Sequence, residues 1–108
     1  MNKDKALSLI GLATKAGRTV SGEFMTEKEV KSGRAALAIV AGDASKNTKK
    51  KFQNMCDFYE VPLCFYGDKE KLGHAIGKEF RASVAILDEG LAKEIQKHIT
   101  LSDKSANY

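Results

Sequence analysis

Apolar residues recur every three or four positions at the start of the chain, with polar residues between them. This spacing predicts a helix from Lys3 to Ala16, and Gly17 follows where a left-handed helix end is expected. Arg18 to Ser21 leaves room only for a short strand. Gly22 breaks that strand before a charged helix from Glu23 to Ser32.

Three apolar runs predict further strands. Leu37 to Ala41 is continuously apolar and contains two β-branched residues, so we expect it to be covered on both faces and central in a sheet. Leu63 to Tyr66 predicts a second buried strand, and Val84 to Leu87 supplies another.

Three more helices are predicted by apolar stripes. Ser45 and Asp68 are expected N-caps of the first two, which Pro62 and Gly77 bring to an end. In chain order, the inward-facing residues are expected to be Phe52, Met55, Cys56 and Tyr59, then Leu72, Ala75 and Ile76, then Leu91, Ile95 and Ile99.

Helices and strands therefore alternate along the whole chain. This order predicts an α/β fold, a three-layer α/β/α sandwich around a small mixed sheet of about four strands. The chain has one proline and no long polar linker, which favours a single domain over residues 1–101. Residues 102–108 are expected to form a frayed tail.

Composition narrows the class of protein. The 108 residues carry a formal net charge of +4, which is compatible with nucleic-acid binding without requiring it. Cys56 and Cys64 show no metal-ligand spacing, so no metal is expected; we predict two small buried thiols in a reducing cytoplasm, with a redox pair as the alternative. The charged start does not resemble a secretory signal, which also favours a cytoplasmic protein.

Two groups of charged or titratable residues are not expected to take part in binding or catalysis. Helical geometry puts Lys46, Lys49 and Lys50 across the helix from its apolar stripe, which predicts a solvated outer face. His74 and His98 lie beside apolar helix positions without a nucleophile and base around them. Because phosphate-binding and dinucleotide-binding loops are also missing from the sequence, we expect neither catalysis nor a cofactor.

The helix from Glu23 carries the first candidate binding residues. Gly22 allows close approach of the backbone to a partner, and the free N–H groups that begin at Glu23 favour phosphate or base oxygens. Lys28 and Lys31 are three residues apart, so they share one helix face and are expected to point outward.

A second segment combines charge with an aromatic residue, because Lys78 and Arg81 flank Phe80. Phe80, like Phe24 and Met25 of the preceding segment, is suited to contact splayed RNA bases. The alternative for these three apolar side chains is packing in the core.

Taken together, these features resemble the kink-turn-binding ribosomal protein superfamily of archaea and eukaryotes, through its small bacterial YlxQ-type members. The similarity covers nearly the whole chain. It is carried by Ser21-Gly22-Glu23 with Lys28-Glu29, by Ala38 to Val40 followed by Asp43-Ala44-Ser45, by Leu72 to Lys78 and by Val84 to Gly90.

The resemblance implies an α/β/α sandwich that binds RNA and is not an enzyme. It also implies that RNA lies against Gly22 to Lys28 and Lys78 to Ser83. Kink-turn-binding members usually carry Gly-x-Asn-Glu-x-x-Lys, and here only Gly22 and Lys28 match. Phe24 and Met25 occupy the Asn and Glu positions and cannot form the expected hydrogen bonds to the G·A pairs of the kink, so general RNA binding is better supported than kink-turn specificity.

We therefore predict a cytoplasmic, non-enzymatic, ribosomal-protein-like protein that binds structured RNA, either ribosomal RNA or another non-coding RNA, and acts in translation. The alternative is a protein-interaction module in which Phe24 and Met25 bind the ribosome or a translation factor. The expected RNA contacts are Gly22, Glu23, Phe24, Lys28, Lys31, Lys78, Phe80 and Arg81.

Overall fold

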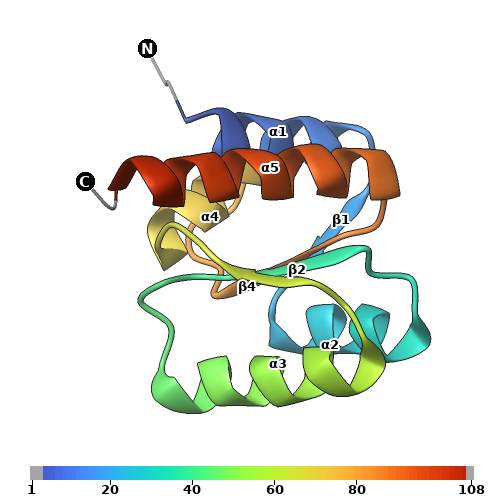
Figure 1. Cartoon of the computed structure of the whole chain (residues 1–108). Helices are drawn as coiled ribbons and strands as arrows, with labels where there is room; N and C mark the ends of the chain where they lie inside the picture. The colour runs from blue at the N-terminus through green and yellow to red at the C-terminus, as the bar shows by residue number, and fades with distance from the viewer. Residues whose placement is uncertain (1–3, 107–108) are drawn as a thin grey trace.

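The computed structural model describes residues 4–106, with side chains described up to residue 100 (Figure 1). Within this range the chain forms five helices and four strands. In order, they are α1 (Lys5–Lys15), β1 (Thr19–Ser21), α2 (Glu23–Ser32), β2 (Leu37–Val40), α3 (Lys46–Tyr59), β3 (Leu63–Phe65), α4 (Lys69–Ala75), β4 (Ser83–Ile86) and α5 (Glu89–Ala106).

The strands form one mixed sheet in the order β1-β4-β2-β3. β4 is antiparallel to β1 and to β2, whereas β2 and β3 are parallel. β2 lies inside the sheet and is buried throughout, as its continuous apolar run predicts. These directions bring the ends of β1, β2 and β3 and the beginning of β4 to one end of the sheet, which we call the Gly22 end.

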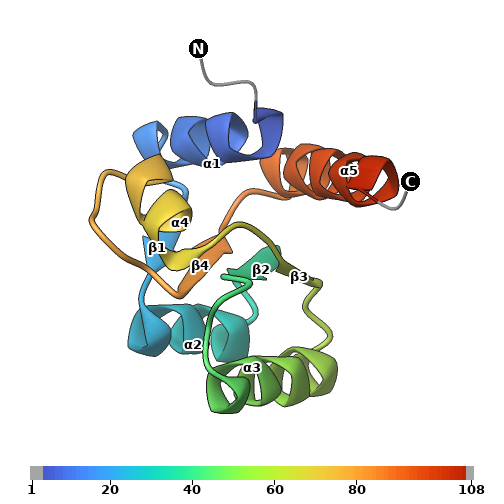
Figure 2. The same cartoon turned by 90° about the vertical axis from the view of Figure 1, so that its left-hand side faces the viewer.

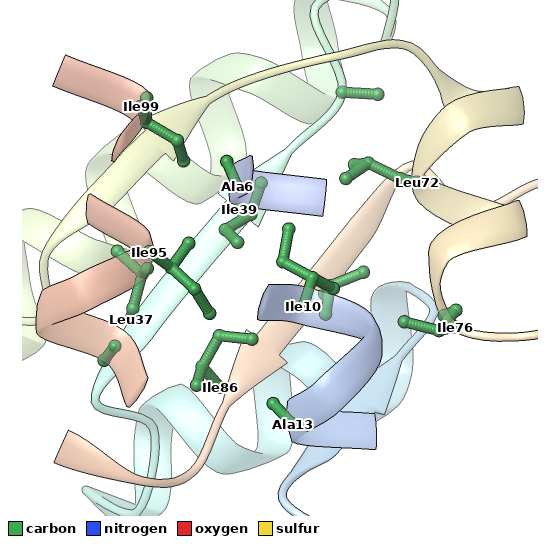
Figure 3. Packing of buried hydrophobic residues seen from close by; sticks show 13 residues of the cluster. Ala6, Ile10, Ala13, Leu37, Ile39, Leu72, Ile76, Ile86, Ile95 and Ile99 are labelled. Carbon is green, nitrogen blue, oxygen red and sulfur yellow. The ribbon is translucent and has the colours of Figure 1, made fainter. Parts of the chain in front are cut away.

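Helices cover both faces of this sheet. α1, α4 and α5 form one layer, and α2 and α3 form the other (Figure 1). Ile10, Leu72 and Ile95 pack with Ile86 in the core under the first layer (Figure 3). Phe52 is fully buried in the second core, under α2 and α3. The predicted α/β/α sandwich is confirmed.

Two predictions of burial are wrong. β3 is an edge strand that pairs only with β2, so its residues are half-buried or exposed instead of buried. Tyr59 is 40% exposed, because its ring packs edge-on against Phe58 at the surface, with ring centroids 4.9 Å apart, rather than against the sheet. The rest of the predicted α3 stripe, Phe52, Met55 and Cys56, is buried.

Side-chain caps fix the beginnings of four helices. Asp4, Ser45, Asp68 and Asp88 each accept a hydrogen bond from a backbone N–H of the first turn, at 2.7 to 3.1 Å, which confirms Ser45 and Asp68 as N-caps. α2 differs, because its N-cap is Gly22, which has no side chain to accept a hydrogen bond from the first N–H groups of the helix.

The last helix, α5, continues to Ala106, into the segment 102–108 where the sequence favours a frayed tail. Residues 107–108 of that segment lie outside the described range. Among the helices of the described residues, none combines the length and the apolar character needed to cross a membrane.

Candidate nucleic-acid interface

The two segments that the sequence singled out meet at the Gly22 end of the sheet. The backbone N–H of Gly22 donates to the carbonyl oxygen of Ser83 at 3.0 Å. Arg81 Nε donates to Ser21 Oγ at 3.1 Å. The beginning of α2 and the connection between α4 and β4, residues 76–82, therefore form one continuous surface.

A buried hydroxyl pair beneath this surface links the same two segments. Ser83 Oγ lies 3.3 Å from Thr26 Oγ1, and both residues are buried. Buried polar groups require hydrogen-bond partners, so each residue fixes the position of the other. The site residues predicted from the sequence do not include this pair. Its only sequence signal is that Thr26 shares the inward stripe of α2 with Val30.

Gly22 has φ 89° and ψ 155°, a conformation that L side chains rarely adopt. A Cβ atom added at Gly22 would meet no other atom within 4 Å, so the space in front of it is open. The residue thus supplies both the chain reversal before α2 and free access to the uncapped N–H groups of the helix.

The apolar residues of both segments are exposed. Phe24 is 76% exposed, Phe80 is 61% exposed and Met25 is 37% exposed. The alternative that these side chains pack in the core is wrong, because all three are exposed. The inward stripe of α2 is formed instead by Thr26, Glu29 and Val30. Exposed aromatic rings of this kind are available to contact a partner.

The predicted cations fall into three groups. Lys28 and Lys78 are exposed and take part in no salt bridge with any described residue. Arg81 is half-buried, and its Nη1 donates to the carbonyl oxygen of Phe80 at 2.7 Å, so it also shapes the connection before β4. Lys31 is exposed but forms a salt bridge with Glu27 at 2.7 Å, which raises the Lys31 pKa.

Glu23 also has a partner, because Lys51 of α3 forms salt bridges with Glu23 and Glu27, each at 2.8 Å. Hydrogen bonds from Lys31 and Lys51 lower the pKa of Glu27. Together these residues fasten the outer face of α2 to α3. Lys28 and Lys78 are therefore more available to bind phosphate than Lys31.

Helix α4 supports the connection before β4. The Arg81 N–H donates to the carbonyl oxygen of Lys69 at 3.0 Å, and the Lys78 N–H to that of Gly73 at 2.7 Å. A Cβ atom at Gly73 would lie 2.4 Å from the carbonyl oxygen of Glu79, closer than such contacts ever are. Only glycine at position 73 allows this approach, and the sequence alone did not reveal that role.

The other candidate chemical groups do not converge on this surface. Cys56 and Cys64 are both free, and burial raises the pKa of the Cys56 thiol to about 11, so it stays protonated near neutral pH. Within residues 4–106, no group of three or more potential ligands is arranged to hold a metal ion. His74 is exposed beside a shallow cavity that Asp4 and Lys71 also line, on the α1 side of the molecule.

Residues 4–96, which include both segments, match the family described as Ribosomal protein L7Ae/L30e/S12e/Gadd45. The chain belongs to this family. Among similar proteins of this type, RNA-binding protein YlxQ from Bacillus subtilis (strain 168) is 42% identical over 81% of this chain and 87% of its own length. RNA-binding protein YlxQ from Enterococcus faecium is 39% identical over 91% of this chain and 94% of its own length. The resemblance to this ribosomal protein family and to its YlxQ-type members, inferred from the sequence, is confirmed.

Solved structures agree with the L7Ae/L30e/S12e/Gadd45 assignment. A Bacillus halodurans C protein, described as having unknown function, superposes with a TM-score of 0.88 at 36% identity, over 91% of this chain and 99% of that one. The Giardia lamblia 15.5kD RNA binding protein superposes with a TM-score of 0.76 at 23% identity, over 91% of this chain and 84% of that one. The second match supports the fold alone. This chain therefore belongs to a family of RNA-binding, ribosomal-protein-like proteins.

Proposed function

We propose that this protein binds structured RNA, ribosomal or otherwise non-coding, through the beginning of α2 and the connection between α4 and β4. It does so in the cytoplasm, as a non-enzymatic component of ribonucleoprotein particles that serve translation. The observation that carries the proposal is the joining of these two segments by the Gly22 to Ser83 hydrogen bond. The names of the YlxQ relatives support the same class of ligand.

The charged and aromatic side chains have separate roles in this proposal. Lys28, Lys78 and Arg81 neutralise phosphates, which gives affinity without sequence information. Gly22 and the uncapped N–H groups of α2 approach the RNA backbone. Phe24 and Phe80 present exposed rings to bases that are unpaired at a bend or a loop.

The preferred RNA is a kink-turn or a similarly bent RNA with unstacked bases. Gly22 and Lys28 keep the matching ends of the usual kink-turn motif, whereas Phe24 and Met25 replace its hydrogen-bonding pair with apolar contacts. Recognition then depends on the shape of the bend and on stacking more than on the edges of paired bases.

A titration of the purified protein against a kink-turn RNA and a matched unkinked duplex tests this function. Each RNA is measured at about 50 mM and about 200 mM salt, because phosphate contacts make affinity fall as salt rises. Tighter, salt-sensitive binding to the kink-turn RNA is expected. Equal binding to both RNAs would reduce the proposal to general RNA binding, and binding to neither would refute it.

A second candidate function is docking of a ribosomal protein or a translation factor on Phe24 and Met25. The exposure of these two adjacent apolar side chains is the observation in its favour. A pull-down after nuclease treatment separates the two functions. A protein partner would stay bound, whereas a partner bridged by RNA would be lost.

A further inference from the structure

A second basic surface lies at the Gly22 end of the sheet, where α3 begins. Lys46 is the first residue of α3 and is exposed. Lys49 follows one turn later, with Nζ 5.9 Å from the ring centroid of Phe65 at the end of β3. That distance is within the range of a cation–π contact, and the Phe65 ring is itself partly exposed. We call Lys46, Lys49 and Phe65 the α3 corner.

Hydrogen bonds connect the α3 corner to the candidate interface. The Gly42 N–H donates to the carbonyl oxygen of Gly67 at 2.8 Å, which joins the turn before α3 to the turn after β3. Asp43 Oδ1 then accepts from the N–H of Lys69 at 2.9 Å, and the Lys69 carbonyl accepts from the Arg81 N–H. Figure 2 views the molecule from this side, with the beginnings of α3 and α4 and the connection before β4 toward the viewer.

The positive charge of the α3 corner is not neutralised within the described part of the chain. Neither Lys46 nor Lys49 forms a salt bridge with a described residue, in contrast to Lys51 on the opposite flank of α3. Asp43 and Asp68 accept backbone N–H groups at the beginning of α4 and form no salt bridge with any described residue. Two cations without a described salt bridge thus lie beside an interface that itself carries Lys28, Lys78 and Arg81.

We propose that the α3 corner is a second RNA contact, which binds the phosphate backbone of a helical arm that leaves the main interface. This inference rests on the proposed function and extends it to a bent RNA with an arm long enough to reach α3. Lys46 and Lys49 each neutralise a phosphate, and the contact with Phe65 holds the Lys49 stem in place. Of the lysines expected on a solvated outer face, Lys50 alone keeps that role.

The test compares Lys46→Ala/Lys49→Ala with the charge-matched control Lys93→Ala/Lys97→Ala on α5. Both double variants and the unaltered protein are titrated at several salt concentrations with a kink-turn RNA with two long arms. The titration is repeated with each arm shortened in turn. Lys46→Gln/Lys49→Gln, which keeps most of each side-chain stem, checks that any loss follows the charge, and circular dichroism checks folding.

With the long-armed RNA, the steepness of the plot of log K against log salt should decrease by roughly 0.7 to 0.9 for each of the two lost contacts. The loss should disappear when one particular arm is shortened, and the α5 control should match the unaltered protein. If Lys46→Ala/Lys49→Ala leaves the steepness of this plot unchanged with every RNA, while Lys28→Ala/Lys78→Ala reduces it, the α3 contact alone would be overturned. A loss independent of arm length would overturn the assignment to an arm. Failure of the unaltered protein to bind any RNA would overturn both this inference and the proposed function.

Discussion

The backbone N–H of Gly22 donates to the carbonyl oxygen of Ser83 at 3.0 Å and so joins the N-cap of α2 to the first residue of β4. The buried contact between Thr26 and Ser83, at 3.3 Å, reinforces the junction from inside. A ligand that contacts the beginning of α2 therefore also meets the connection before β4.

Lys28→Ala/Lys78→Ala should weaken RNA binding without changing the fold, because both lysines are exposed and form no salt bridge with any residue that the structure describes. The plot of log K against log salt has a negative slope, and its steepness should decrease by roughly 0.7 to 0.9 for each lost phosphate contact. Filter-binding titrations at several salt concentrations measure it. Lys93→Ala/Lys97→Ala is the control of equal charge, and a larger effect from that pair would place the interface on α5 instead.

Phe80→Ala should lower RNA affinity by about 1 to 3 kcal/mol, the usual contribution of one base stacked on an aromatic ring. Its free energy of unfolding should change by no more than about 0.5 kcal/mol, since the ring is largely exposed. Phe58→Ala is the control, since Phe58 on α3 is also largely exposed, at 78% against 61% for Phe80. Equal affinity losses for the two variants would argue against a specific contact at Phe80.

Phe24→Asn/Met25→Glu restores the full Gly-x-Asn-Glu-x-x-Lys motif on a surface that tolerates polar side chains, because both positions are exposed. Preference for a kink-turn RNA over a duplex should rise by at least about fivefold, given about 1 to 3 kcal/mol for a good pair of base-edge hydrogen bonds. Phe24→Ala/Met25→Ala is the control, because it removes the same two apolar side chains without adding hydrogen-bonding groups. If that variant gained the same preference, the added hydrogen bonds would not be its cause.

Gly73→Ala should displace the connection before β4, because its Cβ would meet the Glu79 carbonyl oxygen at 2.4 Å. We expect a loss of about 1 to 3 kcal/mol in the free energy of unfolding, as for other overpacked sites, together with weaker RNA binding. Urea denaturation and RNA titration measure the two effects. Gly90→Ala is the control, since a Cβ atom there would have a side-chain atom as its nearest contact, at 3.4 Å. Unchanged stability and RNA affinity in Gly73→Ala would show that the connection adjusts freely.

Stability should depend on pH through Glu29, a buried carboxylate held by Arg34 Nε at 2.7 Å and Nη2 at 2.6 Å. The hydrogen bonds from Arg34 lower its pKa from 4.5, so its stabilising effect is present above pH 4.5 and is lost as pH falls through the folded-state pKa. Glu29→Gln should therefore be less stable than the unaltered protein at pH 7, with a smaller difference at pH 3. Glu94→Gln on α5 is the control, and a difference between Glu29→Gln and the unaltered protein that is the same at both pH values would contradict this account.

Much of the fold follows from local patterns. The periodic apolar residues, the caps Ser45 and Asp68 and the uninterrupted run of β2 each give a strong local signal, and the structure matches them. The burial of β3 could not be inferred in the same way. An apolar run of that length looks the same at the edge of a sheet as inside it, and only the strand order decides which is correct.

The sequence by itself determined the kinds of residue in the candidate site: a glycine before a helix, lysines on its outer face and an aromatic residue beside Arg81. Tertiary structure alone decided that Gly22 contacts Ser83, that Phe24 and Phe80 are exposed, and that Lys31 and Glu23 are held in salt bridges while Lys28 is not. The physical reason is that local periodicity reports only which side of a helix or strand faces inward. Contacts between segments far apart in the chain depend on strand order and on how the helices pack over the sheet.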